Sequence, residues 1–159
     1  VRLNGGSLLV VNTHFDHVSA RARRDAACLL RERIPEIGAE SAGTGDEVPP
    51  VVLVGDLNCT PGSDPHRILI GDDPEGDGKA AETPTEARIA LRDAAAAADL
   101  RHGPETRLTD FARLIDGRRI DHALVSPEVS VEAFATLADR DDRGRYPSDH
   151  LPVLARLSV

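Results

Sequence analysis

Polar residues that could perform acid–base or metal chemistry occur at strand-like apolar segments in four places of this 159-residue chain. The four groups are Asn12-Thr13-His14, Gly55-Asp56-Leu57-Asn58, Ile120-Asp121-His122 and Ser148-Asp149-His150. A β-rich scaffold presents side chains to a substrate at the ends of its strands. Histidine, aspartate and asparagine delivered in this way are the groups used by a metal-assisted phosphoester hydrolase.

The second group has a spacing that suits catalysis. In an extended chain Asp56 and Asn58 share one face, while Leu57 turns into the core. Asp56 can take a proton from water, and Asn58 can hold a phosphate oxygen without adding negative charge. An equally good interpretation of the same residues is a turn that leads into Cys59-Thr60-Pro61-Gly62.

Each of the other three groups, taken alone, is weaker evidence for catalysis. His14 can donate a hydrogen bond to a phosphoryl oxygen, and His17 is a weaker candidate for the same task. Asp121 can orient a histidine through a carboxylate–imidazole bond. Asp149 and His150 are adjacent and point apart, so one would face a metal or phosphate and the other the reacting bond. Each of these residues also has a purely structural interpretation, as a turn residue, a strand-edge carboxylate or a surface histidine.

Hydrophobic periodicity predicts the elements that position these groups. Strands are expected at residues 7–12, 51–54, 120–125, 129–137 and 151–157. A helix is expected from the N-cap Ser19 to about Pro35, followed by a polar loop at 38–50, and a short helix opens at Asp64-Pro65. Residues 71–82 look like a solvated insertion. The sequence Thr83-Pro84-Thr85-Glu86 matches a capping box, which predicts an alanine-rich helix from there to about Leu100. Residues 101–118 look irregular. This order predicts an α/β (or α+β) sandwich with a mixed sheet.

Composition limits the partners. The net charge is −8, only Lys79 is a lysine, and the aromatic residues are three Phe and one Tyr. An acidic chain with few aromatic residues favours a small phosphate ester over nucleic acid as substrate. No membrane span or signal peptide is predicted, and the location stays open, with a cytoplasmic one slightly favoured. Cys28 and Cys59 are too few for a disulfide framework and are expected to act as small apolar residues.

The four groups together resemble the endonuclease/exonuclease/phosphatase superfamily, the deoxyribonuclease I-like proteins. The resemblance is carried by Asn12 to His17, Gly55 to Pro61, Arg119 to His122 and Tyr146 to Val153, and thus covers nearly the whole chain. It implies one partial domain over residues 1–159, part of a four-layer α/β sandwich. It also implies Mg²⁺ (or Mn²⁺) as cofactor and in-line attack by water on a phosphate.

The resemblance also implies a role for each site residue. His14 would contact the phosphoryl group, Asp56 would orient or deprotonate water, and Asn58 would hold that water or a non-bridging oxygen. His150 would stabilise the transition state, with Asp121 orienting it. Asp149, Asp56 and Asn58 would serve the metal.

One departure leaves a second hypothesis open. Family members carry an Asn and a metal-binding Glu on early strands, and this sequence, which starts at Val1 and contains no Met, begins after both. We therefore expect the N-terminal strands to be missing and one sheet face to be uncovered. The alternatives to an active hydrolase are a catalytically incomplete fragment that binds phosphate or a partner without turnover, and a metal-free binding module.

Overall fold

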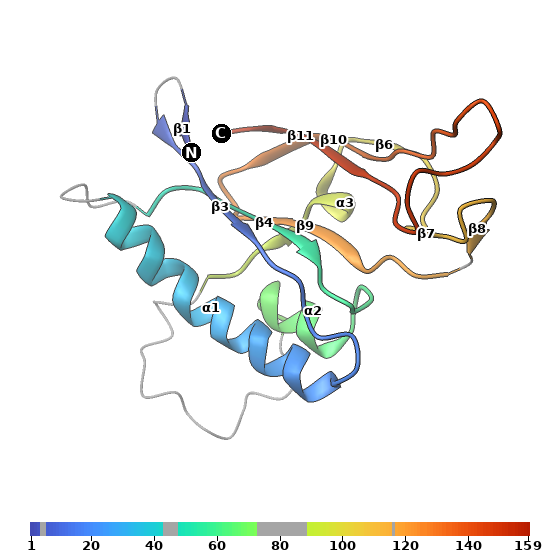
Figure 1. The fold of residues 1–159 in the computed structure, drawn as a ribbon. Helices are drawn as coiled ribbons and strands as arrows, with labels where there is room; N and C mark the ends of the chain where they lie inside the picture. Colours follow the sequence, from blue (N-terminus) through green and yellow to red (C-terminus); the bar gives the residue numbers. More distant parts are fainter. Residues whose placement is uncertain (4–5, 43–47, 73–88, 116) are drawn as a thin grey trace.

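The described part of the protein is built in layers. The computed structural model describes residues 1–3, 6–42, 48–72, 89–115 and 117–159. Two helices lie against one face of a four-stranded sheet, and a second, three-stranded sheet lies on its other side (Figure 1). The prediction of an α/β architecture with a mixed sheet is confirmed, and three layers of the expected sandwich are present in these residues.

The helices and strands follow one another in this order: β1 Arg2–Leu3, β2 Gly6–Ser7, β3 Leu9–Asn12, α1 Ala20–Ala42, β4 Val51–Asp56, α2 Asp64–Leu69, β5 Arg92–Asp93, α3 Ala94–Ala97, β6 Leu100–His102, β7 Leu108–Thr109, β8 Leu114–Ile115, β9 Asp121–Val125, β10 Ser130–Thr136 and β11 Val153–Ser158. The five predicted strands are confirmed with shifts of one to a few residues at their ends.

The four-stranded sheet has the order β3-β4-β9-β5. β3 and β4 are parallel, with Asn12 opposite Val54, whereas β4 and β9 are antiparallel, with Asp56 opposite Asp121. Helices α1 and α2 cover one face and form a core with fully buried Ile34, Leu53 and Leu124. The helix–sheet contact thereby fixes the ends of β3 and β4, which carry the polar groups of interest.

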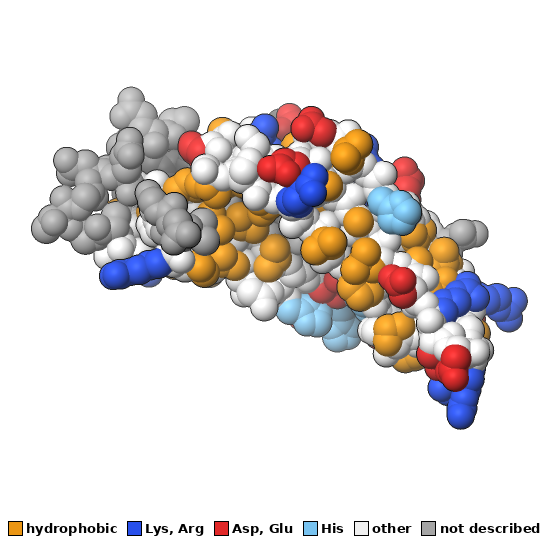
Figure 2. Space-filling view, turned by 90° about the horizontal axis from the view of Figure 1, so that it is seen from above, with side chains coloured by type: hydrophobic (Ala, Val, Ile, Leu, Met, Phe, Trp, Pro, Cys, Tyr) orange, Lys and Arg blue, Asp and Glu red, His pale blue; other side chains and the backbone are white. Residues whose placement is uncertain are grey.

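The second sheet has the order β11-β10-β6 and packs on the opposite face. Its core contains Val125, Val131 and Phe134. On the outer side Leu100 and Leu154 are 65% and 57% exposed. Figure 2 looks from above onto the molecule, and hydrophobic side chains lie between charged ones across this view. No helix of the described residues covers that side.

Helix α1 is longer than the sequence predicted. It begins after Ser19, whose hydroxyl accepts a hydrogen bond from the Ala22 amide (3.1 Å), as expected. It then continues through Pro35 to Ala42, so the prediction that Pro35 ends the helix was wrong, as was a loop beginning at residue 38. A proline inside a helix costs one hydrogen bond, but Ile34 and Gly38 on either side are buried, and this packing outweighs the loss.

The alanine-rich segment is mostly not helical. Within the described residues only Ala94–Ala97 form one helical turn, capped by Asp93, whose carboxylate accepts from the Ala95 amide (3.0 Å). The flanking residues pair with β9 and β10 instead. Sheet pairing and this local cap therefore outweigh the helix propensity of alanine. The predicted insertion at 71–82 lies outside the described residues except for Gly71 and Asp72, and the capping box at 83–86 lies wholly outside them.

Candidate active site

Backbone pairing brings the first two polar groups together. Beyond β3 the chain continues to follow β4, with hydrogen bonds from the Thr13 amide to the Val54 carbonyl (3.1 Å) and from the Phe15 amide to the Asp56 carbonyl (2.9 Å). Gly55 allows this approach, because a Cβ there would lie 1.8 Å from the Thr13 carbonyl oxygen and its φ is +145°. As a result His14 lies beside Asp56, with Nε2 and Oδ2 3.5 Å apart.

Asp56 divides its two oxygens between a turn and the site. Its Oδ1 accepts a hydrogen bond from the Asn58 amide (2.8 Å), while Oδ2 faces His14. Asn58 has a left-handed φ of +47° and donates from Nδ2 to the Phe15 carbonyl (2.9 Å). The turn interpretation and the catalytic interpretation of these residues are therefore compatible, because Oδ2 of Asp56 and Oδ1 of Asn58 stay available.

The third group joins through β9. Asp56 and Asp121 are directly opposite on antiparallel strands, so their side chains share a face. Two carboxylates so placed repel each other, and Asp56 contributes to raising the pKa of Asp121. Burial is the largest cause of that rise, and the hydrogen bond from His150 offsets part of it.

The fourth group completes the cluster. His150 pairs by a bridge with Leu108, ahead of β11, and its Nδ1 lies 2.9 Å from Oδ2 of Asp121. Since a carboxylate only accepts, Nδ1 is the donor and Nε2 is the nitrogen available to a substrate. Burial works against protonation of His150, but Asp121, Asp56 and Asp149 together raise its pKa above the ordinary value.

We call Asp56, Asp121 and His150 the open cluster. Their candidate ligand atoms all lie within 4.8 Å of one another, and each side chain is only partly buried. His14 and Asn58 adjoin it, so five of the six residues predicted from the sequence come together. Asp149 is not in this group: its side chain is exposed and accepts from the Ser148 hydroxyl (3.2 Å). His17 is also exposed.

The donor set suits a hard divalent cation. Mg²⁺ prefers oxygen ligands and is commonly held by one or two carboxylates together with water and substrate phosphate. The facing carboxylates of Asp56 and Asp121, with the free amide oxygen of Asn58 nearby, provide that chemistry, and a cation there would relieve their repulsion. The residues present therefore fit the implied metal.

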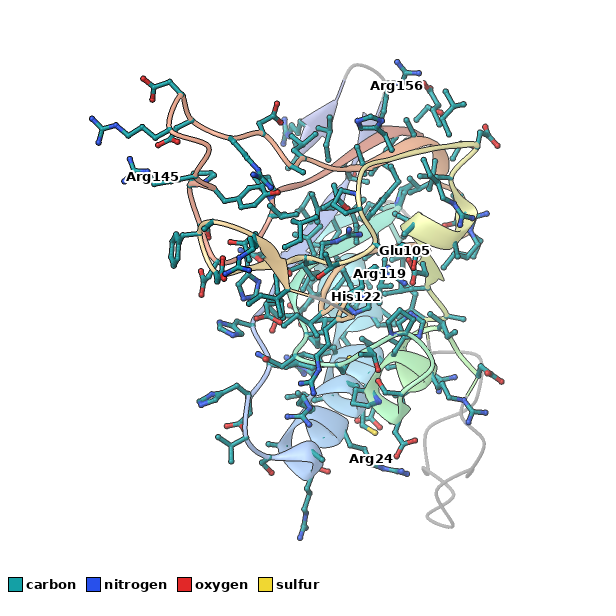
Figure 3. All side chains as sticks on the ribbon, turned by 90° about the vertical axis from the view of Figure 1, so that its right-hand side faces the viewer. Arg24, Glu105, Arg119, His122, Arg145 and Arg156 are labelled. Carbon is teal, nitrogen blue, oxygen red and sulfur yellow. The ribbon has the colours of Figure 1, made fainter. Side chains whose placement is uncertain are left out.

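A second cluster, absent from the sequence predictions, lies on the other face of β9. Nε2 of His66 is 3.0 Å from Oδ2 of Asp93, and Arg119 binds both oxygens of the same carboxylate. Ligand atoms of His66, Asp93 and His122 lie within 4.8 Å of one another, and all three residues are buried. We call His66, Asp93 and His122 the buried cluster, and Figure 3 labels His122 and the adjoining Arg119 near the middle of the view.

Hydrogen bonding defines the state of the buried histidines. Nε2 of His122 lies 2.8 Å from the Cys59 carbonyl and therefore donates to it. Burial lowers the pKa of His122 to about 4, so this ring is neutral at pH 7. Asp93 is buried as well, yet its bonds from His66 and Arg119 hold the pKa of its carboxyl well below the usual range. No local pattern in the sequence predicted this network, because its members come from three segments that lie far apart in the chain.

A model of the Endonuclease/Exonuclease/phosphatase family matches residues 3–150. The chain belongs to this family. Solved structures agree with this. An endonuclease/exonuclease/phosphatase from Bacteroides vulgatus is 30% identical to this chain and superposes with a TM-score of 0.69; the match covers 92% of this chain and 47% of the Bacteroides vulgatus chain. No match was found among curated proteins.

Two further structures share the fold. The mannosyl-6-phosphatase Bt3783 from Bacteroides thetaiotaomicron VPI-5482 has a TM-score of 0.72 at 24% identity, over 94% of this chain and 51% of its own. ANGEL2, a 2′,3′-cyclic phosphatase, has a TM-score of 0.60 at 15% identity, over 94% of this chain and 56% of its own. This chain thus spans about half the length of the relatives it matches. None of its described helices is apolar enough over a sufficient length to cross a membrane.

Proposed function

We propose that this chain carries the reacting groups of a metal-dependent phosphoester hydrolase, in which water attacks a phosphate. The observation that carries the proposal is the open cluster, in which two facing carboxylates meet His150 at the ends of strands. Family membership and the phosphatases among the similar structures support the same reaction class.

Each residue has a part in this reaction. Asp56 accepts the proton of the attacking water, since its Oδ2 is not used by the turn. His14, 71% exposed, contacts the phosphoryl oxygens, and Asn58 holds an oxygen through its free carbonyl. His150, oriented by Asp121, donates a hydrogen bond from Nε2 to the charge that develops on the phosphate.

A divalent ion fits the same place. Asp56, Asp121 and Asn58 would hold it, with Asp149 close enough to contribute to the field at His150. When bound, Mg²⁺ or Mn²⁺ would act as a Lewis acid on the phosphate.

A small phosphomonoester or phosphodiester is the proposed substrate class. Phe15, Phe134 and Tyr146 are buried, so Phe111, at 51% exposed, is the one aromatic ring available for stacking on a base. Single-stranded nucleic acid is usually stacked on several aromatic rings, and this chain has only four, three of them buried.

The test is hydrolysis of bis-para-nitrophenyl phosphate with Mg²⁺, with Mn²⁺ and with chelator. Asp56→Ala and His150→Ala should each lower the rate by about 100-fold or more, because each removes a proton-handling group. Matched exposed controls, Asp142→Ala and His17→Ala, should keep full activity. Folded protein that binds Mn²⁺ through Asp56 without any turnover would instead support the incomplete-fragment alternative.

A further inference from the structure

A cavity of about 710 Å³ lies next to the open cluster but is lined by none of its residues. It is open to solvent on one side and is lined by residues of α3, β6, the segment after β6 and β10. Its polar lining side chains include Arg101, Arg107, Arg119, Thr60, Thr106 and Thr136. The acidic residue Glu105 also lines it, and Figure 3 shows Arg119 and Glu105 on the side of the molecule that carries α3.

The positive charge in this cavity is only partly neutralised. Arg119 is bound by Asp93, whereas Arg101 donates to the Ala96 carbonyl (2.7 Å), which is neutral. Arg107 donates to the Pro104 carbonyl (3.2 Å) and to the hydroxyl of Thr136. No carboxylate of the described residues forms an ion pair with Arg101 or Arg107.

Among the three arginines that line the cavity, Arg107 is the most deeply buried. It is 2% exposed, and its Nε finds no hydrogen-bond partner in the described part of the chain. Burying a guanidinium is costly unless an anion and hydrogen bonds compensate it. Burial is the largest cause that lowers the pKa of Arg107, and the charge of Arg119 adds to it, whereas the carboxylates of Asp121 and Asp93 act in the opposite direction.

The cavity shares a wall with the open cluster. The Arg107 carbonyl accepts from the Leu151 amide (2.7 Å), and the next residue, Leu108, bridges to His150. Thr60, which also lines the cavity, follows Asn58 by two residues along the chain.

We propose that this cavity is a binding subsite for an oxyanion, a phosphate or carboxylate group, held by Arg107 with Arg101 and Arg119. Two sources share this chemistry. The anion is either a second acidic group of the molecule whose phosphoester occupies the open cluster, which rests on the proposed function, or a separate small anion.

Binding of inorganic sulfate, followed by amide NMR and calorimetry without divalent metal, tests the site. Sulfate should shift the amides of Gly103 and Gly117, which line the cavity. Arg107→Gln should weaken binding about 10-fold or more, and the exposed change Arg101→Gln about 3-fold. Glu105→Gln should strengthen binding about 3-fold, since it removes a negative charge from the rim.

The same experiment separates this proposal from the proposed function. His150→Ala should lower the rate of hydrolysis by about 100-fold or more but leave the sulfate affinity unchanged. The oxyanion site is refuted if sulfate shifts only amides around Asp56, or if Arg101→Gln and Glu105→Gln both leave the affinity unchanged. These two surface variants keep the test valid even where Arg107→Gln fails to fold.

The source of the anion is decided by comparing methyl phosphate with alkanediol bisphosphates of increasing length. A bisphosphate that binds at least 10-fold more tightly, with the gain lost in both Arg107→Gln and His14→Ala, identifies a second group of one substrate. Equal affinities for all of them identify a separate anion.

Discussion

Adjacent residues of β9 belong to two clusters of similar composition. Asp121 lies in the open cluster with Asp56 and His150, and His122 lies in the buried cluster with His66 and Asp93. Both sets combine histidine with aspartate within 4.8 Å, but the strand alternation sends them to opposite faces of one sheet.

The two clusters differ in whether their polar atoms are already satisfied. Asp93 accepts from Arg119, His66 and the Ala95 amide, so its lone pairs are used within the fold. In the open cluster, Oδ2 of Asp56 faces His14, which is mostly exposed, and Nε2 of His150 has no partner among the described residues. Residue type alone therefore does not make a reactive site; unused donors and acceptors that reach solvent do.

The largest expected contrast is in stability. Asp93→Asn should lower the free energy of unfolding by about 3 kcal/mol, because it leaves the guanidinium of Arg119 without its buried anion. Asp121→Asn, at a partly exposed position, should cost less than about 1 kcal/mol. Urea denaturation at pH 7 measures both, and equal costs would contradict the division into a structural and a reactive cluster.

The second largest effect should be a loss of stability at acidic pH, caused by His122 of the buried cluster. Burial lowers the pKa of His122 to about 4 in the folded protein. Between this pH and the ordinary pKa of histidine, the ring is therefore protonated in the unfolded chain but neutral in the folded protein. Its contribution to stability is present above about pH 6.5 and is lost as the pH falls, on the order of 3 kcal/mol between pH 7 and pH 4.

Comparing the wild type with His122→Gln isolates this effect. The glutamine can keep a donor for the Cys59 carbonyl but does not titrate, so its stability should fall less steeply between pH 6.5 and pH 4. Parallel curves for the two proteins would show that His122 is not a buried neutral imidazole.

A smaller loss of stability should follow from a backbone change that affects the open cluster more than the buried one. Gly55→Ala places a methyl group against the Thr13 carbonyl and should destabilise the protein by about 2 kcal/mol. It should also disturb the amide signals of His14 and Asp56 more than those of His66 and Asp93.

Gly144→Ala is the matched control for this substitution. Its φ of +75° is also positive, but nothing lies within 4 Å of the added Cβ. If both substitutions cost the same, the contact with Thr13 does not shape the site.

The smallest expected effect concerns the charge of His150. Asp121→Asn should lower the pKa of His150, because the neutral amide no longer stabilises the imidazolium. A proton NMR titration of the imidazole measures this shift, and the pKa of His122 should stay in place. Asp149→Asn should have a smaller effect than Asp121→Asn; the reverse order would contradict the pairing of Asp121 with His150.

The open cluster was largely predictable from the sequence because its parts are local. Asp56 and Asn58 follow one apolar strand, His14 follows another, and strand ends gather polar residues at one edge of a sheet. That Asp56 faces Asp121 depends on strand register, which no single segment specifies. Asp149 shows the same limit, since it adjoins His150 in the chain but lies outside the cluster.

The sequence by itself determined the fold class, the main strands, the cap of α1 and the chemical character of the site, because periodicity and short-range hydrogen bonds act within a few residues. Tertiary structure alone decided that α1 continues through Pro35, that the alanine-rich segment is largely not helical, and that Asp93, Arg119, His66 and His122 meet in the interior. The physical reason is that burial and strand pairing between distant segments outweigh local propensities, and a buried charge acquires its partner only when the whole chain has packed around it.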